Sequence, residues 1–281
     1  FELFNKLNKK EINRIVKKHK PDIIHAHDYK ASVIATLLPF KGTIISHLHI
    51  NSPIAKTYNL KSLLYISRLK KIKKIVGVSN SVLDEAIFKN KIINKYITIY
   101  NYVDKEKILK KSQLNCSDYY DLYFIGRLNE YKNPLMFIEI IKKIKEKRNN
   151  IKAVMIGDGE LKKDCLNLIK EYQLENNIKL VGFVENPFPI IKNSKVCIMP
   201  SIYEGFGLTA VESLILDKVV LNSGVGGLAE IFEENKQYIC SDIDEYVSKF
   251  FKYENIKSSV KIDKFVNKSN WIEKIKKLYM K

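Results

Sequence analysis

The sequence predicts an α/β fold in which parallel sheets are covered by helices on both faces. Short, nearly continuous apolar runs alternate along the chain with longer segments that have helical amphipathic spacing. Strands of a parallel sheet are buried on both faces, so they are apolar throughout instead of alternating with polar residues. A regular alternation of such strands with helices indicates doubly wound, Rossmann-like domains.

Nine of the apolar runs are expected to be strands: Asp22–Ala26, Thr43–Leu48, Lys74–Val78, Tyr96–Tyr100, Leu122–Ile125, Lys152–Ile156, Lys179–Gly182, Val196–Pro200 and Val219–Asn222. Helical spacing is clearest at Pro134–Glu146 and Leu161–Tyr172. The last segment, Asn267–Lys281, predicts an amphipathic helix with Trp271 and Leu278 on its apolar side.

The strand–helix alternation weakens at Asp104–Tyr120, which is polar and charged, and a new strand with a glycine turn follows at once. We interpret this stretch as a linker between two domains. The predicted organisation is a first domain at residues 1–110, a second at 111–265 and a closing helix at 266–281. The chain begins at Phe1, without an initiator methionine, so the natural start is expected upstream and the first domain is expected to be incomplete.

The composition of the 281 residues, with 46% hydrophobic and 28% charged, is that of a soluble globular protein. No run of eighteen apolar residues is present, so no membrane-spanning segment is expected. Cys116, Cys165, Cys197 and Cys240 are far apart and form no CxxC pair. This spacing predicts neither a disulfide framework nor a zinc site, and it fits a reducing cytoplasm.

The net charge of +18 could indicate a nucleic-acid partner, but its distribution argues against one. Only four basic residues are arginines, and the lysines are spread along helical segments as solvated faces. The densest basic cluster, residues 68–74, has no RNA- or DNA-binding motif beside it. We therefore expect no nucleic-acid partner, and the charge favours attraction to anionic lipid or phosphate-bearing substrates.

The segment from Pro200 to Ser213 has the strongest chemical signature. An apolar strand ends at Pro200, a loop carries Glu204-Gly205-Phe206-Gly207, and a helix is expected from Leu208, with Glu212 in its first turns. Ligands of open α/β sheets bind at the carboxyl ends of strands. Glycines let backbone N–H groups approach an anion, and the helix N-terminus adds positive dipole. The two carboxylates are expected to face the same crevice.

This segment resembles the signature of glycosyltransferase family 4, the retaining, two-domain GT-B glycosyltransferases. Three further motifs resemble those of the family: Ile125-Gly126-Arg127-Leu128 with Lys132, Met155-Ile156-Gly157-Asp158-Gly159, and Ser223-Gly224-Val225-Gly226-Gly227. The resemblance implies two doubly wound domains that face a cleft. It implies transfer of a hexosyl unit from a nucleotide diphosphate sugar to a glycan or lipid-linked acceptor in surface polysaccharide or glycolipid assembly.

Roles for individual residues follow from the same resemblance. Arg127 and Lys132 would neutralise the departing diphosphate, and Glu204 would contact the sugar hydroxyls. Glu212 would contact the nucleotide ribose, and the base would lie near Phe183. The expected site residues are His49, Glu204, Arg127 and Lys132 for catalysis, and Gly126, Gly157, Phe183, Gly205, Phe206, Gly207, Leu208, Glu212, Gly226 and Gly227 for donor binding.

Two HxH pairs end strands of the first domain, His25/His27 and His47/His49. Period two places each pair on one face of its strand, so a zinc hydrolase is one alternative. A metal site needs further ligands in register, and the only other histidine, His19, lies in a basic helix. By resemblance, His49 is the histidine near the reaction centre, with His47 the second choice.

The expected enzyme is a cytoplasmic, metal-independent glycosyltransferase, which works at the inner membrane face if its acceptor is lipid-linked. It needs no cofactor, since a UDP-sugar, or alternatively a GDP-sugar, is its donor substrate. Three rival functions remain open: a sugar-nucleotide epimerase, a non-catalytic nucleotide-sugar-binding module and, less favoured, the metal hydrolase.

Overall fold

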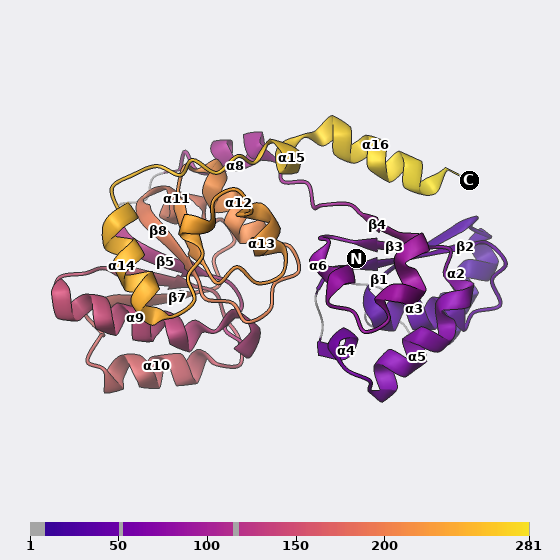
Figure 1. Cartoon of the computed structure of the whole chain (residues 1–281), viewed down its shortest axis with the longest axis horizontal. Coiled ribbons are helices and arrows are strands. Elements are labelled where there is room, and N and C mark those ends of the chain that lie inside the picture. The colour runs from indigo at the N-terminus through magenta and orange to yellow at the C-terminus, as the bar shows by residue number, and fades with distance from the viewer. Residues whose placement is uncertain (1–8, 51–52, 115–117, 281) are drawn as a thin grey trace. The chain divides into compact units, whose positions relative to one another are not determined.

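The computed structural model describes residues 9–50, 53–114 and 118–280, which form two compact units with one parallel sheet each (Figure 1). The first unit contains the chain up to Tyr100 together with Ser269–Lys281, and the second contains Asn101–Lys268. All nine predicted strands are present, with ends that differ from the prediction by at most two residues, so the α/β prediction is confirmed.

The four strands of the first unit lie side by side in chain order: β1 (Ile23–His27), β2 (Thr43–Leu48), β3 (Lys74–Gly77) and β4 (Tyr96–Thr98). The α-helices of this part of the chain are α2 (Lys9–His19), α3 (Asp28–Thr36), α4 (Pro53–Lys56), α5 (Leu60–Arg68), α6 (Ser81–Asp84) and α7 (Lys89–Ile92). Helices α3 and α5 pack together on one face of the sheet, where Ser46 of β2 hydrogen-bonds both Ser32 and Tyr65.

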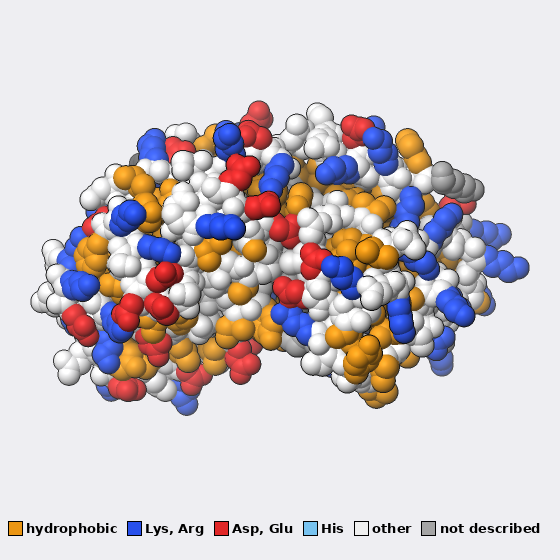
Figure 2. Space-filling view, viewed as in Figure 1, with side chains coloured by type: hydrophobic (Ala, Val, Ile, Leu, Met, Phe, Trp, Pro, Cys, Tyr) orange, Lys and Arg blue, Asp and Glu red, His pale blue; other side chains and the backbone are white. Residues whose placement is uncertain are grey.

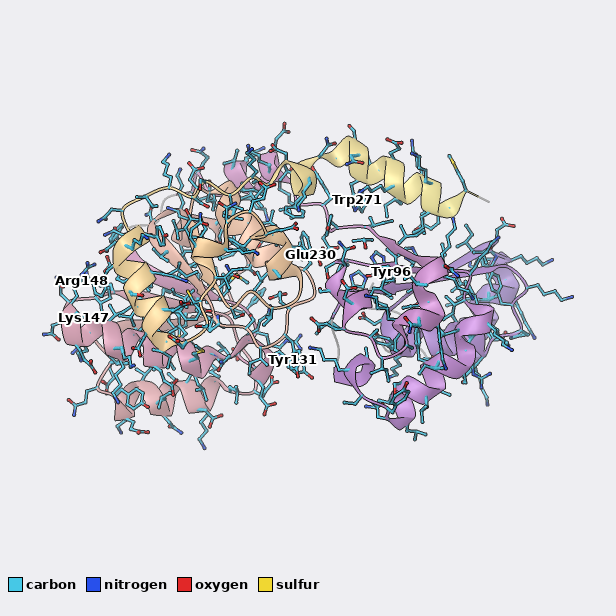
Figure 3. All side chains as sticks on the ribbon, in the orientation of Figure 1. Tyr96, Tyr131, Lys147, Arg148, Glu230 and Trp271 are labelled. Atoms are coloured by element: carbon cyan, nitrogen blue, oxygen red, sulfur yellow. The ribbon has the colours of Figure 1, made fainter. Side chains whose placement is uncertain are left out.

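The predicted C-terminal helix, α16 (Lys268–Tyr279), packs on the first sheet. Its Leu278 completes a buried cluster with Ile45, Val76 and Ile99, and Trp271 points from α16 towards the same sheet (Figure 3). Apolar side chains on one stripe of the helix therefore attach the end of the chain to its first unit.

The second sheet has the strand order β7-β6-β5-β8-β9, with β5 (Tyr120–Ile125), β6 (Ala153–Ile156), β7 (Ile178–Gly182), β8 (Ser194–Met199) and β9 (Val219–Asn222). The chain first winds outward from β5 to β7 and then returns to the other side of β5 at β8. The order therefore reverses between β5 and β8, and this reversal is where doubly wound sheets bind ligands.

Helices cover both faces of the second sheet (Figure 1). One layer contains α9 (Pro134–Lys147), α10 (Lys162–Glu171) and α14 (Ile243–Tyr253). The other contains α8 (Lys105–Lys111), α11 (Phe188–Lys192) and α12 (Leu208–Ile215), and the short helices α13 (Gly227–Ile231) and α15 (Asp263–Val266) complete the unit. No helix in the described part of the chain is long and apolar enough to cross a membrane.

The stretch that we interpreted as a linker is partly helical. Asp104 caps α8 by accepting a hydrogen bond from the Lys107 backbone N–H, and α8 packs on α11 and α12. This packing places the boundary between the units after Tyr100, earlier than the predicted position near residue 110. Cys116, which also falls in that stretch, lies outside the described residues.

Candidate donor-binding site

The loops that follow β5 and β8 are joined at the switch point of the second sheet, which is the place between these strands where the strand order reverses. The Tyr131 carbonyl, in the loop after β5, accepts hydrogen bonds from the backbone N–H groups of Ile202 and Tyr203, at 2.8 and 3.3 Å. The Tyr131 and Tyr203 rings also meet edge to face, with centroids 5.4 Å apart. These contacts fix the loop that carries Glu204 against the loop that carries Arg127.

Close contact between glycines joins the carboxyl ends of β5, β6 and β7. The Gly157 N–H donates to the Gly182 carbonyl at 2.8 Å, and a Cβ atom on Gly157 would lie 1.9 Å from the Gly126 carbonyl oxygen. Gly157 has φ +143°, a conformation open to glycine and strained for other residues. Gly126 and Gly157 therefore serve as close-packed backbone beneath the site.

A pocket of about 710 Å³ opens at these strand ends, within the size range of small-molecule sites. All of its walls belong to the second unit. Six of the predicted site residues line it: Gly126, Arg127, Gly157, Phe183, Leu208 and Glu212.

The pocket presents cations and a helix N-terminus to an anion. The Arg127 side chain is exposed, and no described carboxylate lies within ion-pair distance of it. Leu208 begins α12, whose N-cap is Gly207 with φ 101°, so no side chain caps the first N–H groups of this helix. Unpaired N–H groups and the helix dipole both favour a bound phosphate.

Glu212 contributes a carboxyl group from α12 to the same pocket. Burial raises its pKa from 4.5 to about 7, because the ionised form loses water contacts without a compensating cation. A desolvated acceptor of this kind suits hydroxyl donors on a ligand. The Phe183 ring lies at another wall of the pocket and is 79% exposed, so its face is available for stacking.

The remaining donor-side residues are not among those that line the pocket. Lys132 and Glu204 form an ion pair with each other, with Glu204 the more buried partner. The Gly227 N–H donates to the Glu204 carbonyl at 3.3 Å, and a Cβ on Gly227 would overlap the Phe206 backbone. The structure therefore gives Gly205, Phe206, Gly207, Gly226 and Gly227 a packing role between two loops.

Sequence reasoning missed one wall of the pocket. Tyr102, Asp104, Lys107 and Lys111 line it, and three of them lie in the stretch interpreted as a linker. A signal was available there, because Asp104 followed by Lys-Glu-Lys-Ile is a capped helix start. Lys107 and Lys111 are one helical turn apart and add two further cations to the pocket.

His49 belongs to the first unit and lies in a cluster with three other histidines. Parallel pairing sets His27 beside His47, so both HxH pairs share one face of the sheet. His27 Nδ1 lies 2.7 Å from His49 Nε2, and His25 Nε2 lies 3.2 Å from His47 Nδ1. Burial lowers all four pKa values, that of His25 to about 4 and that of His47 to about 2.

The fold and the pocket together define a GT-B-type protein, with two parallel α/β units and a pocket lined by Arg127, Lys107 and Lys111 at the switch point of the second. A profile described as "Glycosyl transferases group 1" matches residues 104–276, and one described as "Glycosyltransferase Family 4" matches residues 2–107. The chain belongs to the group 1 glycosyl transferases.

Several curated proteins are similar in sequence. An uncharacterized glycosyltransferase of Methanocaldococcus jannaschii is 30% identical over 236 residues, which are 76% of this chain and 58% of that protein. A UDP-Gal:alpha-D-GlcNAc-diphosphoundecaprenol alpha-1,3-galactosyltransferase of Escherichia coli is 29% identical over 304 residues, covering 95% of this chain and 77% of that protein. A capsular polysaccharide biosynthesis glycosyltransferase of Staphylococcus aureus is 26% identical over 233 residues, covering 78% and 64%. The chain spans 58% and 64% of the length of the first and third of these proteins, and 44% of the length of a related acetylgalactosaminyltransferase of Campylobacter jejuni.

Solved structures share the fold. HepE of Anabaena in complex with UDP and glucose has a TM-score of 0.80 at 18% identity, covering 96% of this chain and 80% of that one. TarM of S. aureus in complex with UDP and glycan ligands has a TM-score of 0.71 at 19% identity, covering 95% and 55%. The predicted GT-B fold is confirmed.

Proposed function

We propose that this chain binds a nucleotide diphosphate sugar in the pocket of the second unit and transfers its hexosyl group, with retention, to a glycan or lipid-linked acceptor. The observation that carries the proposal is the convergence of Arg127, the α12 N-terminus and Glu212 on one pocket at the switch point. Relatives named for capsule and undecaprenol-linked glycan synthesis favour surface polysaccharide or glycolipid assembly as the process.

Each part of the donor has a matching wall. Arg127 and the N–H groups of α12 suit the diphosphate, Glu212 suits ribose hydroxyls, and the exposed Phe183 ring suits the base. Neutralisation of the leaving diphosphate by Arg127, Lys107 and Lys111 removes the need for a metal ion in this step. A UDP-sugar is the expected donor, with a GDP-sugar as the alternative, since fold relatives were solved with UDP.

In this scheme the departing phosphate helps to remove the acceptor proton on the face from which it leaves. Glu204, which forms an ion pair with Lys132, would accept hydrogen bonds from sugar hydroxyls once the donor competes for Lys132. His49 is the proposed acceptor-side residue from the first unit.

A lipid-linked acceptor would bring the first unit to a membrane surface at the cytoplasmic face. Helix α5 and the residues before it expose Tyr58, Leu60, Leu63 and Leu64, and Leu60 is 84% exposed. Figure 2 shows this apolar patch, with lysine and arginine side chains near it. Apolar side chains beside basic ones favour binding to anionic lipid surfaces.

Calorimetric titration with UDP-, GDP- and ADP-sugars tests donor binding. Arg127→Ala should weaken the preferred donor by about 10- to 100-fold, because a charge-assisted contact to phosphate contributes about 1.5–3 kcal/mol. Arg14→Ala, which removes an exposed arginine from α2, is the matched control and should leave affinity unchanged. The donor proposal fails if no nucleotide sugar binds, or if both variants behave alike.

The reaction products separate the proposed transferase from its rivals. A glycosylated acceptor with unchanged anomeric configuration supports transfer. A free epimerised sugar nucleotide would instead identify an epimerase, and tight donor binding with neither product would identify a binding module.

A further inference from the structure

The four clustered histidines of the first unit lie outside the donor pocket, and the proposed transfer uses only His49 among them. They occupy the carboxyl ends of neighbouring strands β1 and β2, where His27 is the register partner of His47. Because side chains of a strand alternate between faces, His25, His27, His47 and His49 share one face. Their rings stack, with the closest centroids 4.3 Å apart, between His47 and His49.

Three of these rings bring nitrogen atoms together. One ring nitrogen from each of His27, His47 and His49 lies within 4.8 Å of the other two. Two ligands of a tetrahedral zinc ion with Zn–N bonds of about 2.0–2.1 Å are about 3.3 Å apart. The distance of 2.7 Å between His27 Nδ1 and His49 Nε2 is shorter than this value, and the limit of 4.8 Å for the three nitrogens is longer. Small side-chain rotations would therefore bring all three nitrogens to ligand distance.

The neighbours of His47 allow two proton arrangements. Its Nδ1 faces His25 Nε2 at 3.2 Å, and His25 Nδ1 faces the Tyr279 hydroxyl at 2.6 Å. If His47 Nδ1–H donates to His25, then His25 Nδ1–H donates to Tyr279, and His47 Nε2 keeps a free lone pair. The reverse order would leave His47 Nε2–H as a buried donor.

His47 Nε2 is buried and has no hydrogen-bond partner among the described residues. A buried polar atom without a partner destabilises the folded state. A bound cation would satisfy this atom in the first tautomer. The partners at His47 Nδ1 then resemble those that hold metal-binding histidines, which typically donate their second ring N–H to a neighbouring acceptor.

We propose that His27, His47 and His49 bind one divalent transition-metal ion of the zinc class, with His25 and Tyr279 orienting His47. Three neutral imidazoles suit zinc, nickel or copper, whereas magnesium and calcium prefer oxygen ligands. The fourth coordination position is open to water or to the Asp28 carboxylate, which accepts the His49 backbone N–H at 3.0 Å. All of these residues belong to the first unit, so the site does not depend on the donor pocket.

The test is Zn²⁺ titration of the full, tag-free chain against a chromophoric chelator, with Co²⁺ absorption reporting the coordination geometry. We expect one equivalent of Zn²⁺ and a tetrahedral Co²⁺ spectrum. His27→Gln and His49→Gln, at half-buried positions, should each weaken Zn²⁺ by at least 100-fold. His19→Gln, in α2, is the matched control and should leave the affinity unchanged.

Two further measurements separate a specific site from damage or surface binding. Zn²⁺ should raise the melting midpoint of the wild-type chain and of His19→Gln but not that of His49→Gln, because only a ligand that binds the native state stabilises it. Tyr279→Phe should weaken Zn²⁺ by several-fold through the orientation of His47. A millimolar affinity for Zn²⁺, or equal losses of Zn²⁺ affinity in His19→Gln and His49→Gln, would overturn the proposal. Donor binding in the second unit should be the same with or without chelator.

Discussion

Glu212 offers a sharp test, because its burial predicts opposite effects on folding and on donor binding. Its pKa is about 7 in the folded chain, against an ordinary value of 4.5 for a glutamate in water. A carboxyl group with a raised pKa binds its proton more tightly when folded. Its contribution to stability is therefore complete below about pH 4.5 and is lost as the pH rises through about 7.

The size of this effect follows from the shift. A difference of about 2.5 pKa units corresponds to about 3 kcal/mol at about 1.4 kcal/mol per unit, and the partial water contact of Glu212 makes this an upper limit. Glutamine has the shape of the protonated acid and carries no charge. Glu212→Gln should therefore match the wild type near pH 4.5 and exceed its unfolding free energy by about 2–3 kcal/mol at pH 8.

The same substitution should impair the proposed donor site. An ionised carboxylate that accepts ribose hydroxyls contributes about 1.5–3 kcal/mol, so the dissociation constant should rise about 10- to 100-fold at pH 8. Wild-type affinity should increase as the pH rises through about 7, whereas the affinity of the variant should be independent of pH in that range. A charged group that destabilises the fold is expected where function requires it.

Urea denaturation at pH 4.5, 6 and 8, paired with donor titration at the same pH values, measures both effects. Glu171→Gln, at an exposed position at the end of α10, is the control and should change neither. If Glu212→Gln is not more stable than the wild type at pH 8, the burial argument is wrong. If it is more stable but binds donor normally, Glu212 does not contact the donor.

Two other predictions concern the pocket floor and the α5 surface. Gly157→Ala should lower the unfolding free energy by more than about 2 kcal/mol because its Cβ would meet the Gly126 carbonyl, whereas Gly182→Ala, with φ +74° and open space, should lower it by only about 1–2 kcal/mol in thermal or urea unfolding. Leu60→Gln with Leu63→Gln should reduce cosedimentation with anionic vesicles at least 10-fold, since each leucine removed from lipid forfeits up to about 1.5–3 kcal/mol. Leu166→Gln, an exposed leucine of α10, should bind vesicles like the wild type, and equal binding by all three proteins would contradict the membrane proposal.

The strands could be predicted because their signal is local. A buried parallel strand such as Ala153–Ile156 is apolar at every position, and this can be read without knowledge of its neighbours. The position of Arg127 and Glu212 near one pocket also follows from sequence, since each comes soon after a strand of the same parallel sheet. The carboxyl ends of parallel strands lie at one edge of their sheet.

Features that depend on pairing between distant segments could not be predicted. The polar stretch after Asp104 resembles a linker by composition, yet its few apolar residues, such as Ile108, bury α8 against α11 and α12. The ion pair between Lys132 and Glu204 likewise joins two loops seventy-two residues apart. Charge and composition identify such residues but do not say which of them meet.

The histidines show how one fact of register changes a chemical interpretation. Each HxH pair alone supplies two imidazoles on one strand, and two ligands are too few for a stable zinc site. The strand order β1-β2 and the pairing of His27 with His47 place the two pairs side by side, so the number of candidate ligands doubles without any new residue. A shift of the pairing by one residue would turn His47 and His49 to the face of the sheet opposite His25 and His27, and the cluster would not form. The proposed metal site is therefore a property of the sheet register, which the sequence of either strand alone does not contain.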